Sequence, residues 1–411
     1  MLASTLESLR CPFCGTALTL IDNAALERTS DRISAGVLGC QCCAFPVVAG
    51  IPVLIADDRT REAMHALEAG RGEAALLTLL GLDTDERRTA FRAFMARGVA
   101  GTFREALEIL SPDAEGTYFI YRFSDPTYVT IRAVVRSLGG QRRPGRVIDV
   151  CGGAGHLTRD LLALPSGPFT ALADVFFWKL WLAQTFVAPG CEPVCCDGNA
   201  PLPFASHTFG MVVLADAFPY IWHKRMLADE LVRVAEPEGF VVMPHLHSSL
   251  AFNFSAGMTL TPAAYADLLA ELKPRLFRDQ VLTDGVLDRC VVDLSAPGTA
   301  VDVGDEPSFT LVAGGDDLFR RYAIEEPSGV AGELIVNPLY AVTRAGGQTE
   351  LTLTFPTPEY EEEFGGCRRY MPDSLTLPGD LSGPLRPEMF GKEYEELRRR
   401  HVLLDAPRRY C

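Results

Sequence analysis

Hydrophobic residues in the middle of the chain come in short, nearly unbroken runs separated by segments with helical spacing. Four such runs lie at residues 147–151, 169–174, 208–216 and 240–247. Strands that are buried on both faces read in this way, and the helical segments between them would cover the two faces of a sheet. The pattern therefore predicts an α/β domain with a mostly parallel sheet.

The pattern changes on both sides of this region. Residues 58–140 carry Ala, Leu, Arg and Glu at helical spacing, which predicts a helical connector or cap that includes a helix over 61–80. After closing strands near 275–282 and 290–294, short strand patterns return at 309–312, 332–336, 339–343 and 350–355, and a helix follows at 394–404. Because 411 residues exceed one ordinary domain, we expect four parts: a cysteine-containing module at 1–57, the connector at 58–140, the sheet domain at 141–295 and a β-rich extension at 296–411.

The first apolar run leads directly into a glycine-rich turn. Asp149 and Cys151 lie at the end of the run, and Gly152, Gly153 and Gly155 follow before a helical pattern begins. Small residues let the backbone approach a ligand closely, and the first amides of a helix are free to bind a carboxylate or a phosphate. The turn lacks the Gly-x-Gly-x-x-Gly spacing of dinucleotide enzymes, which argues against a nicotinamide cofactor.

Acidic residues lie at the ends of the following strands. Asp174 ends the second run, about 20 residues past the turn, which is the spacing of a carboxylate that binds a ribose diol. Asp197 precedes the fourth predicted strand, and Asp216 ends it. Each acid also has an ordinary explanation, since Asp149 can cap the glycine turn, Asp174 a helix and Asp197 a loop turn. Their joint occurrence favours one crevice that binds an adenosyl group.

Together, the segments 149–155, 174, 197–204 and 209–220 resemble the class I S-adenosylmethionine-dependent methyltransferase family, over roughly residues 110–295. The resemblance implies a Rossmann-like core with a mostly parallel seven-stranded sheet and S-adenosylmethionine as cofactor. It places the methionine part in the glycine turn, where Cys151 replaces the family's usual small residue. It also places the ribose hydroxyls on Asp174 and the adenine amine near Asp197. The implied cofactor-binding residues are Asp149, Cys151, Gly152, Gly153, Gly155, Asp174, Val175, Asp197, Gly198, Asp216 and Ala217.

Candidate catalytic side chains follow the fourth and fifth strands, where they would face the transferred methyl group. His245 and His247 alternate along the fifth strand and so share one face. A histidine near its ordinary pKa can act as general base toward an acceptor. Tyr220 and His223 are the corresponding candidates after the fourth strand. A hydrogen-bonded structural role is the alternative for each histidine.

Residues that bind the acceptor are expected before the first strand and after the fifth. In the resembling family the segment before the first strand often folds over cofactor and substrate, so Tyr118, Tyr121 and Arg122 are candidates to line the pocket. Aromatic packing on the sheet is the alternative for them. Asn253 follows the fifth strand and is a candidate to orient the substrate. The sequence Asn-Pro-Leu-Tyr at 337–340 looks like the motif of amide- and base-methylating enzymes, but its position far beyond the core excludes that role.

The first part of the chain contains two Cys-x-x-Cys pairs, which can place four thiolates around one zinc ion. The spacing favours Cys11, Cys14, Cys40 and Cys43 as ligands, with Cys42 as the alternative fourth ligand. Residues 45–55 resemble the end of the small zinc ribbons of the methyltransferase-activator family. Four thiolates leave no open position, so this zinc would be structural. Disulfides or a metal-free core are the alternatives, but 12 cysteines without a signal-peptide pattern favour a reducing cytoplasm.

Charge and hydropathy narrow the range of partners. A net charge of −15 disfavours nucleic acid, and no apolar run reaches the length of a membrane span. We expect a cytoplasmic enzyme that transfers a methyl group to a small-molecule acceptor such as a sugar or secondary metabolite. It would carry the structural zinc module and use a histidine as general base. Two alternatives stay open: a scaffold with a degenerate methyltransferase fold, and a non-methylating transferase or cyclase that uses the same cofactor. The β-rich extension either covers the active site or makes a homo-oligomer contact.

Overall fold

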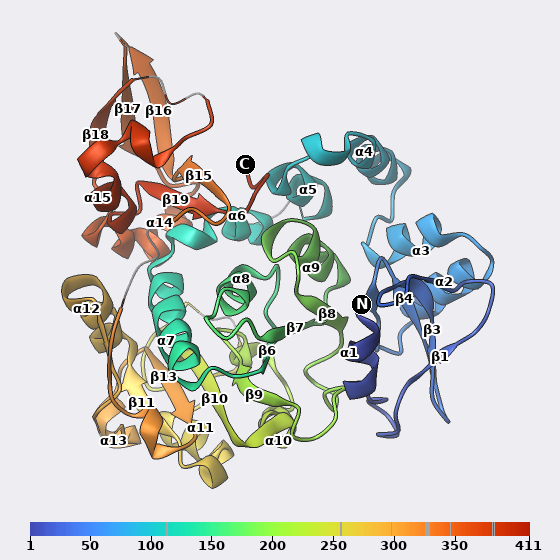
Figure 1. Ribbon diagram of the computed structural model, residues 1–411. Helices are drawn as coiled ribbons and strands as arrows, with labels where there is room; N and C mark the ends of the chain where they lie inside the picture. The colour runs from blue at the N-terminus through green and yellow to red at the C-terminus, as the bar shows by residue number, and fades with distance from the viewer. Residues whose placement is uncertain are drawn as a thin grey trace.

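The computed structural model describes residues 1–111, 114–254, 257–296, 298–324, 329–345, 347–379, 381 and 383–411. Its centre is a seven-stranded sheet with the order β11-β13-β10-β9-β6-β7-β8 (Figure 1). Every neighbouring pair from β8 to β10 is parallel, and β13 runs antiparallel between β10 and β11. The predicted fold class, a Rossmann-like α/β core with a mostly parallel seven-stranded sheet, is therefore confirmed. The strands are β6 Arg146–Val150, β7 Phe169–Asp174, β8 Glu192–Cys195, β9 Phe209–Val213, β10 Ala235–His247, β11 Arg275–Arg278 and β13 Ser308–Ala313.

Helices cover both faces of this sheet because side chains of its strands alternate between two apolar cores. Val147 and Met211 face a core shared with α7, whereas Ile148 and Val212 face a core shared with α10 and α11. Asp125 caps α7 by accepting a hydrogen bond from the amide of Thr127 at 2.7 Å, and Pro126 is the first helical residue. The helices around the sheet are α7 Pro126–Arg142, α8 His156–Leu162, α9 Phe177–Leu182, α10 Lys224–Val234, α11 Pro262–Leu268, α12 Asp279–Arg289 and α13 Ala300–Val303.

The end of the sheet domain differs from the prediction. The run at 309–312 was assigned to the C-terminal extension, but β13 lies inside the central sheet between β10 and β11. Its residues from Phe309 to Ala313 are all buried, which is the burial of an internal strand. Residues 290–294 do not close the sheet, because Val291–Asp293 forms β12 and pairs outside it with β14, Arg321–Ala323. The predicted strand at 275–282 ends at Arg278, where α12 takes over.

The first part of the chain packs edge-on against the central sheet. Its own sheet has the order β1-β3-β4-β5, and β2 pairs with β3. Val53 forms a parallel bridge to Cys195 of edge strand β8, and the Leu54 amide donates to the Cys195 carbonyl at 2.7 Å. This docking covers a strand edge that would otherwise expose unpaired backbone groups. The elements are α1 Ala3–Ser8, β1 Thr19–Ile21, β2 Glu27–Arg28, β3 Ile33–Gly39, β4 Ala44–Val48 and β5 Ile51–Pro52.

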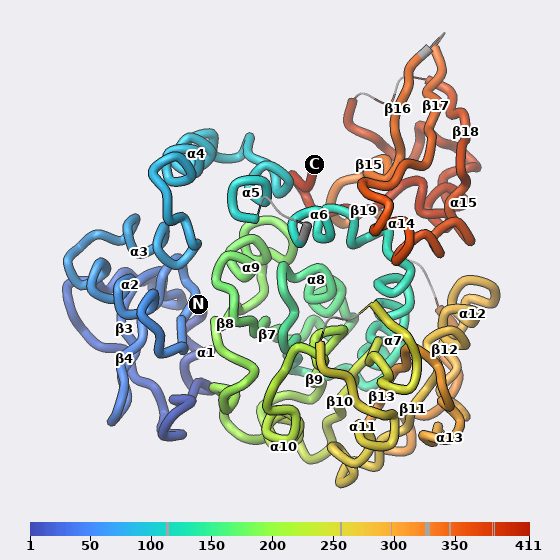
Figure 2. Tube along the Cα trace, turned by 180° about the vertical axis from the view of Figure 1, so that it is seen from behind, coloured from blue at the N-terminus to red at the C-terminus, as the bar shows by residue number. Residues whose placement is uncertain are grey.

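The connector is helical, as the pattern predicted, but its first helix is divided. The single helix expected over 61–80 breaks at Gly70, whose φ of 72° ends α2 in the left-handed region. The last connector helix, α6, crosses the sheet domain beside α8 in both views (Figures 1 and 2). The connector helices are α2 Asp58–Glu68, α3 Gly72–Leu79, α4 Asp85–Ala96, α5 Phe103–Leu110 and α6 Ala114–Tyr121, followed by the 3₁₀ turn η2 at Arg122–Ser124.

The C-terminal extension is rich in short strands and returns to the core at its end. The buried Tyr410 hydroxyl donates to the Phe119 carbonyl of α6 at 2.7 Å. Buried Asn337 accepts a hydrogen bond from Ser124 at 2.8 Å and donates to the His401 carbonyl at 2.8 Å, which is a structural role. The predicted helix at 394–404 stops at Arg399 because residues 403–406 pair with β15. The elements are β15 Glu333–Val336, β16 Tyr340–Ala345, β17 Gln348–Leu353, α14 Pro358–Phe364, β18 Ser374–Pro378, α15 Tyr394–Arg399 and β19 Leu403–Ala406.

Among the helices of the described ranges, none combines the length and the apolar character that a bilayer crossing requires.

Candidate functional site

The turn after β6 has a backbone that only small residues permit. Cys151, Gly153 and Gly155 have φ values of 57°, 57° and 80°. A Cβ on Gly152 would lie 2.5 Å from Cγ of Asp149, so the turn rests directly on that carboxylate. The left-handed φ of Cys151 explains why a small residue is favoured there.

The Asp149 carboxylate is buried beneath this turn. Its Oδ2 accepts a hydrogen bond from the Thr158 hydroxyl of α8 at 2.6 Å. Its Oδ1 has no hydrogen-bond partner among the described residues, although Asp149 is only 1% exposed. Burial raises the pKa of Asp149 to about 7. A buried acceptor without a donor is costly and calls for a ligand or a water to explain it.

Asp174 joins the glycine turn to the end of β7. Its two carboxylate oxygens accept hydrogen bonds from the Gly153 amide at 3.0 Å and the Phe176 amide at 2.9 Å. Burial raises the pKa of Asp174. The residue is not the N-cap of the next helix, since α9 begins at Phe177. Exposed Val175 follows it at the same edge.

The loop after β8 lies against the same turn. A Cβ on Gly198 would be 3.3 Å from Sγ of Cys151, so the two loops are in contact. Asp197 accepts hydrogen bonds from the amide and the side chain of Asn199 at 2.8 and 3.1 Å, which shows the turn-forming role considered from the sequence. The glycine turn, Asp174 and the loop at 197–198 therefore meet at the carboxyl edge of the sheet.

A second polar cluster lies at the same edge, beyond β9 and β10. Asp216 Oδ1 is 3.1 Å from Nε2 of His247, and the rings of His245 and His247 are 4.8 Å apart between centroids. One ligand atom from each of the three residues lies within 4.8 Å of the other two. Asp216 and His245 both have a φ of 57°, which is rare for residues other than glycine and is typical of functional sites.

Two charged residues around this cluster were missed by the sequence analysis. Asp279 Oδ2 is 2.7 Å from Nδ1 of His245, and its Oδ1 accepts a hydrogen bond from Thr310 of β13 at 2.8 Å. Asp125 pairs with Arg122. The sequence held no signal for Asp279, because it stands at the first position of a helix in a segment predicted as a strand.

The charges of the cluster determine the protonation of its members. Burial alone would lower the pKa of His245, but its bond to Asp279 and the negative charge of Asp216 raise it to about 9. Burial alone would raise the pKa of Asp216, but its bond to His247 and the nearby charges of His245 and Arg122 lower it. The guanidinium of Arg122 is 3.9 Å from Oδ2 of Asp216.

The remaining candidates divide between this cluster and other roles. Tyr118 lies 5.0 Å from the Arg122 guanidinium, measured from its ring centroid, and so borders the cluster. Tyr121 instead packs against Tyr360 of α14, with 5.6 Å between ring centroids. Asn253 donates to the carbonyls of Ser248 and Ala251 and so holds its own loop.

The two candidates after β9 are exposed. Nδ1 of His223 donates a hydrogen bond to the Asn199 carbonyl, 3.1 Å away. Tyr220 belongs to the 3₁₀ turn Phe218–Tyr220 and is 58% exposed. Of the four candidate catalytic residues, the cluster defined above contains His245 and His247.

The cysteines of the N-terminal module also converge. Sγ of Cys11 is 3.7 Å from Sγ of Cys42, Sγ of Cys14 is 3.7 Å from Sγ of Cys40, and Cys40 and Cys42 are 3.6 Å apart. Tetrahedral zinc with Zn–S bonds near 2.3 Å requires sulfurs about 3.8 Å apart. The group whose sulfurs lie close enough to share one ion contains Cys42 rather than the expected Cys43, whose Sγ is 3.4 Å from that of Cys42 and whose amide donates to Sγ of Cys40 at 3.2 Å.

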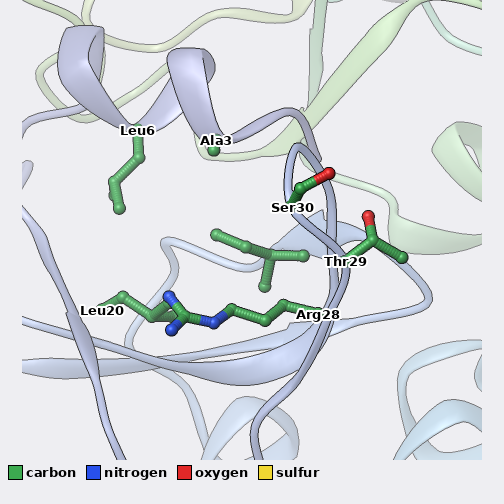
Figure 3. A pocket seen from close by; sticks show the side chains of 7 residues that line it. Ala3, Leu6, Leu20, Arg28, Thr29 and Ser30 are labelled. Atoms are coloured by element: carbon green, nitrogen blue, oxygen red, sulfur yellow. The ribbon is translucent and has the colours of Figure 1, made fainter.

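A pocket within this module lies apart from both polar clusters (Figure 3). It opens between α1, which contributes Ala3 and Leu6, and the segment from β1 to the residue after β2, which contributes Leu20, Arg28 and Thr29. Its walls contain one ionisable group, Arg28, so we assign it no chemistry.

No protein-family model and no curated protein matches the sequence. Solved structures with partial likeness include a complex of the Haloferax volcanii Trm112 methyltransferase activator with a putative methyltransferase, at 15% identity over 41% of this chain and 82% of that chain, with a TM-score of 0.31. They also include a SAM-dependent methyltransferase from Aquifex aeolicus, at 17% identity over 47% of this chain and 95% of that chain, with a TM-score of 0.33. A third is the plantazolicin methyltransferase BamL, at 10% identity over 51% of this chain and 96% of that chain, with a TM-score of 0.34. The fold assignment rests on the topology of the central sheet given above.

Proposed function

We propose that this protein is an S-adenosylmethionine-dependent methyltransferase that acts on a small-molecule acceptor. The observation that carries the proposal is the contact between three loops at the carboxyl edge of the sheet. The glycine turn is tied to Asp174 through the Gly153 amide, and Gly198 lies against Cys151. In an open parallel sheet, ligands bind at this edge.

The residues at this edge fit the cofactor. Its ribose hydroxyls would bind Asp174, whose carboxylate stands at the end of β7 with lone pairs left over from its two amide bonds. The unpartnered Oδ1 of Asp149 offers an acceptor beneath the glycine turn for the methionine part. Asp197 and Gly198 would border the adenine. When bound, S-adenosylmethionine supplies an electrophilic methyl group on a positively charged sulfur.

The acceptor would bind at the cluster of Asp216, His245 and His247. We assign His247, which is hydrogen-bonded to Asp216, as the group that takes up the acceptor's proton. Arg122, next to Asp216, and Tyr118, next to the guanidinium of Arg122, would line the acceptor pocket on this side. Holding the nucleophile in line with the methyl group supplies most of the rate enhancement in such a site, because it replaces an encounter in solution.

The rim beside this cluster favours an acceptor with apolar parts. The loops after β9 and β10 touch, since the Met258 amide donates to the Pro219 carbonyl at 2.8 Å. Trp222 and Phe252 on these loops are 76% and 80% exposed. Large exposed apolar side chains beside a polar centre are typical of a ligand-binding surface.

We also assign a structural zinc ion to Cys11, Cys14, Cys40 and Cys42, because their spacings fit four thiolates around one ion. The ion would hold together a module with a small core of its own. This module covers the edge of β8, next to the strand that ends in Asp174.

The test is titration calorimetry of the full-length protein with S-adenosylmethionine and S-adenosylhomocysteine. Binding of both supports the proposal. Binding of neither by folded, zinc-loaded protein would favour the scaffold alternative. Methyl transfer to an acceptor, followed by mass spectrometry, separates methylation from a non-methylating use of the cofactor.

A further inference from the structure

The cluster beyond β9 and β10 has the geometry of a metal site. It brings together two imidazoles and one carboxylate, with ligand atoms mutually within 4.8 Å. The one direct distance, 3.1 Å from Asp216 Oδ1 to His247 Nε2, agrees with the roughly 3.0–3.4 Å between neighbouring ligands when metal–ligand bonds are near 2.1 Å. Three protein ligands from two adjacent strand ends leave further coordination positions of the metal open to water or substrate, as in catalytic metal sites.

The surroundings of the histidines are those of metal ligands. Nδ1 of His245 is hydrogen-bonded to Oδ2 of Asp279 at 2.7 Å. Nε2 is therefore the nitrogen of His245 that is available to an ion. Asp279 is itself fixed by Thr310 at 2.8 Å. A carboxylate on the far nitrogen is the usual way in which a metal-binding histidine is oriented.

The balance of charge also favours a divalent cation. Among the paired groups, Arg122 contributes one positive charge and Asp125, Asp216 and Asp279 contribute three negative charges. Glu363 is a further acid near Asp216 and both histidines. Metal ligation requires neutral imidazoles, so with both histidines as ligands the paired groups carry two negative charges before the ion is counted. The side chains of Asp125 and Asp279 are 1% and 11% exposed, so water screens this charge poorly. One divalent ion would neutralise it.

We infer that Asp216, His245 and His247 bind a divalent transition-metal ion, oriented by Asp279, that takes an oxygen atom of the acceptor as a further ligand. Two imidazoles and a carboxylate suit zinc, iron or manganese. The part that the ion plays in catalysis rests on the proposed methyltransferase function, whereas the binding of the ion to these residues does not. A bound ion would lower the pKa of a coordinated hydroxyl, so the acceptor would release its proton to water, and His247 would act as a ligand in place of the general-base role given to it above for the metal-free site. This substrate class comprises phenols, enols and other hydroxyl compounds rather than amines.

The experiment is a titration with Mn²⁺ of full-length protein that holds zinc at the four cysteines alone, at about one zinc per chain by metal analysis, followed by the electron paramagnetic resonance signal of the free ion. Mn²⁺ prefers carboxylate and imidazole over the thiolates of the N-terminal module. We expect about one bound ion per chain, as one three-ligand site requires. Affinity should fall by about 10–100-fold in Asp279→Asn, which keeps every ligand but loses the orienting carboxylate. His247→Gln should abolish binding, and His65→Gln on exposed helix α2 is the matched control.

Two results would overturn the inference: no binding of Mn²⁺ or Co²⁺ to folded wild-type protein, or unchanged affinity in both His247→Gln and Asp279→Asn. Calorimetry with S-adenosylmethionine on the same samples separates a failure of the metal site from a failure of the proposed function. Cofactor binding without ion binding would refute the metal site alone, and ion binding without cofactor binding would refute the methyltransferase alone.

Discussion

Replacing Asp149 by asparagine is expected to stabilise the protein and to weaken its cofactor site at the same time. The carboxylate is buried, and burial raises its pKa from 3.8 to about 7. The folded state therefore holds a proton between these two pH values that the unfolded state has released. Stability falls as pH rises through this window, because the charged form is disfavoured in the fold.

The size of the pH effect on stability follows from the pKa shift of Asp149. Three pKa units at about 1.4 kcal/mol each give roughly 4 kcal/mol of destabilisation well above pH 7, and none below about pH 4. The Asp149→Asn variant would avoid this penalty, but the buried amide group that it introduces would lack an acceptor, which costs about 1–3 kcal/mol. We expect a net gain of about 1–3 kcal/mol at pH 8 that shrinks toward zero or reverses at pH 5.

The assay is urea unfolding from pH 5 to pH 8.5, followed by tryptophan fluorescence. Trp178 and Trp181 lie on α9, so the signal reports on the sheet domain. Asp83→Asn, at an exposed carboxylate, is the matched control and should not change the pH dependence. A stability difference between Asp149→Asn and wild type that does not change with pH would refute the reasoning. The same variant should bind S-adenosylmethionine at least about tenfold more weakly, since one charge-assisted hydrogen bond contributes about 1.5–3 kcal/mol.

Three further predictions concern the turn, the ribose site and the zinc site. Asp174→Ala should weaken cofactor binding by about 10²–10⁴-fold through loss of two charge-assisted bonds; calorimetry measures this, and unchanged affinity in a folded variant contradicts the ribose assignment. Cys151→Gly should stabilise the apo-protein by about 1 kcal/mol, because glycine adopts the left-handed φ of 57° without strain; a lower melting temperature contradicts this. Metal analysis should find about one zinc fewer per chain in Cys42→Ser than in Cys43→Ser, and chelation should lower the melting temperature; equal zinc in both variants contradicts the ligand set.

The convergence of the glycine turn, Asp174 and Asp197 at one edge of the sheet was largely predictable from sequence because its signals are local. The glycine turn combines a left-handed backbone with close packing on Asp149, and both needs select small residues at fixed positions. Asp174 stands at the end of a strand whose apolar run is unmistakable. Parallel strands bring their carboxyl ends to one edge, so separate strand-end residues could be placed together without knowledge of the loops.

The acceptor side was less predictable because it depends on contacts across the chain. Asp279 reaches His245 only because β13 inserts beside β10 and fixes the acid through Thr310. An antiparallel insertion of this kind has no local sequence signature, and the apolar run at 309–312 fits either domain. The choice between Cys42 and Cys43 likewise depended on the conformation of the tight turn, which brings Sγ of Cys42 close to the sulfurs of Cys11 and Cys40. Tyr220, His223 and Asn253 were plausible by position, but loop conformation leaves Tyr220 exposed and directs His223 and Asn253 to backbone carbonyls.

The distribution of these contacts makes the whole chain the functional unit rather than the sheet domain alone. A fragment of residues 141–295 would lack β13, and β11 would then lose the strand that joins it to the central sheet. It would also lack Arg122, which pairs with Asp216, and Thr310, which holds Asp279. The C-terminal extension fixes the segment before α7 in turn, because Asn337 accepts from the Ser124 side chain and Tyr370 donates to the Ser124 carbonyl. The β-rich extension therefore anchors the residues next to Arg122.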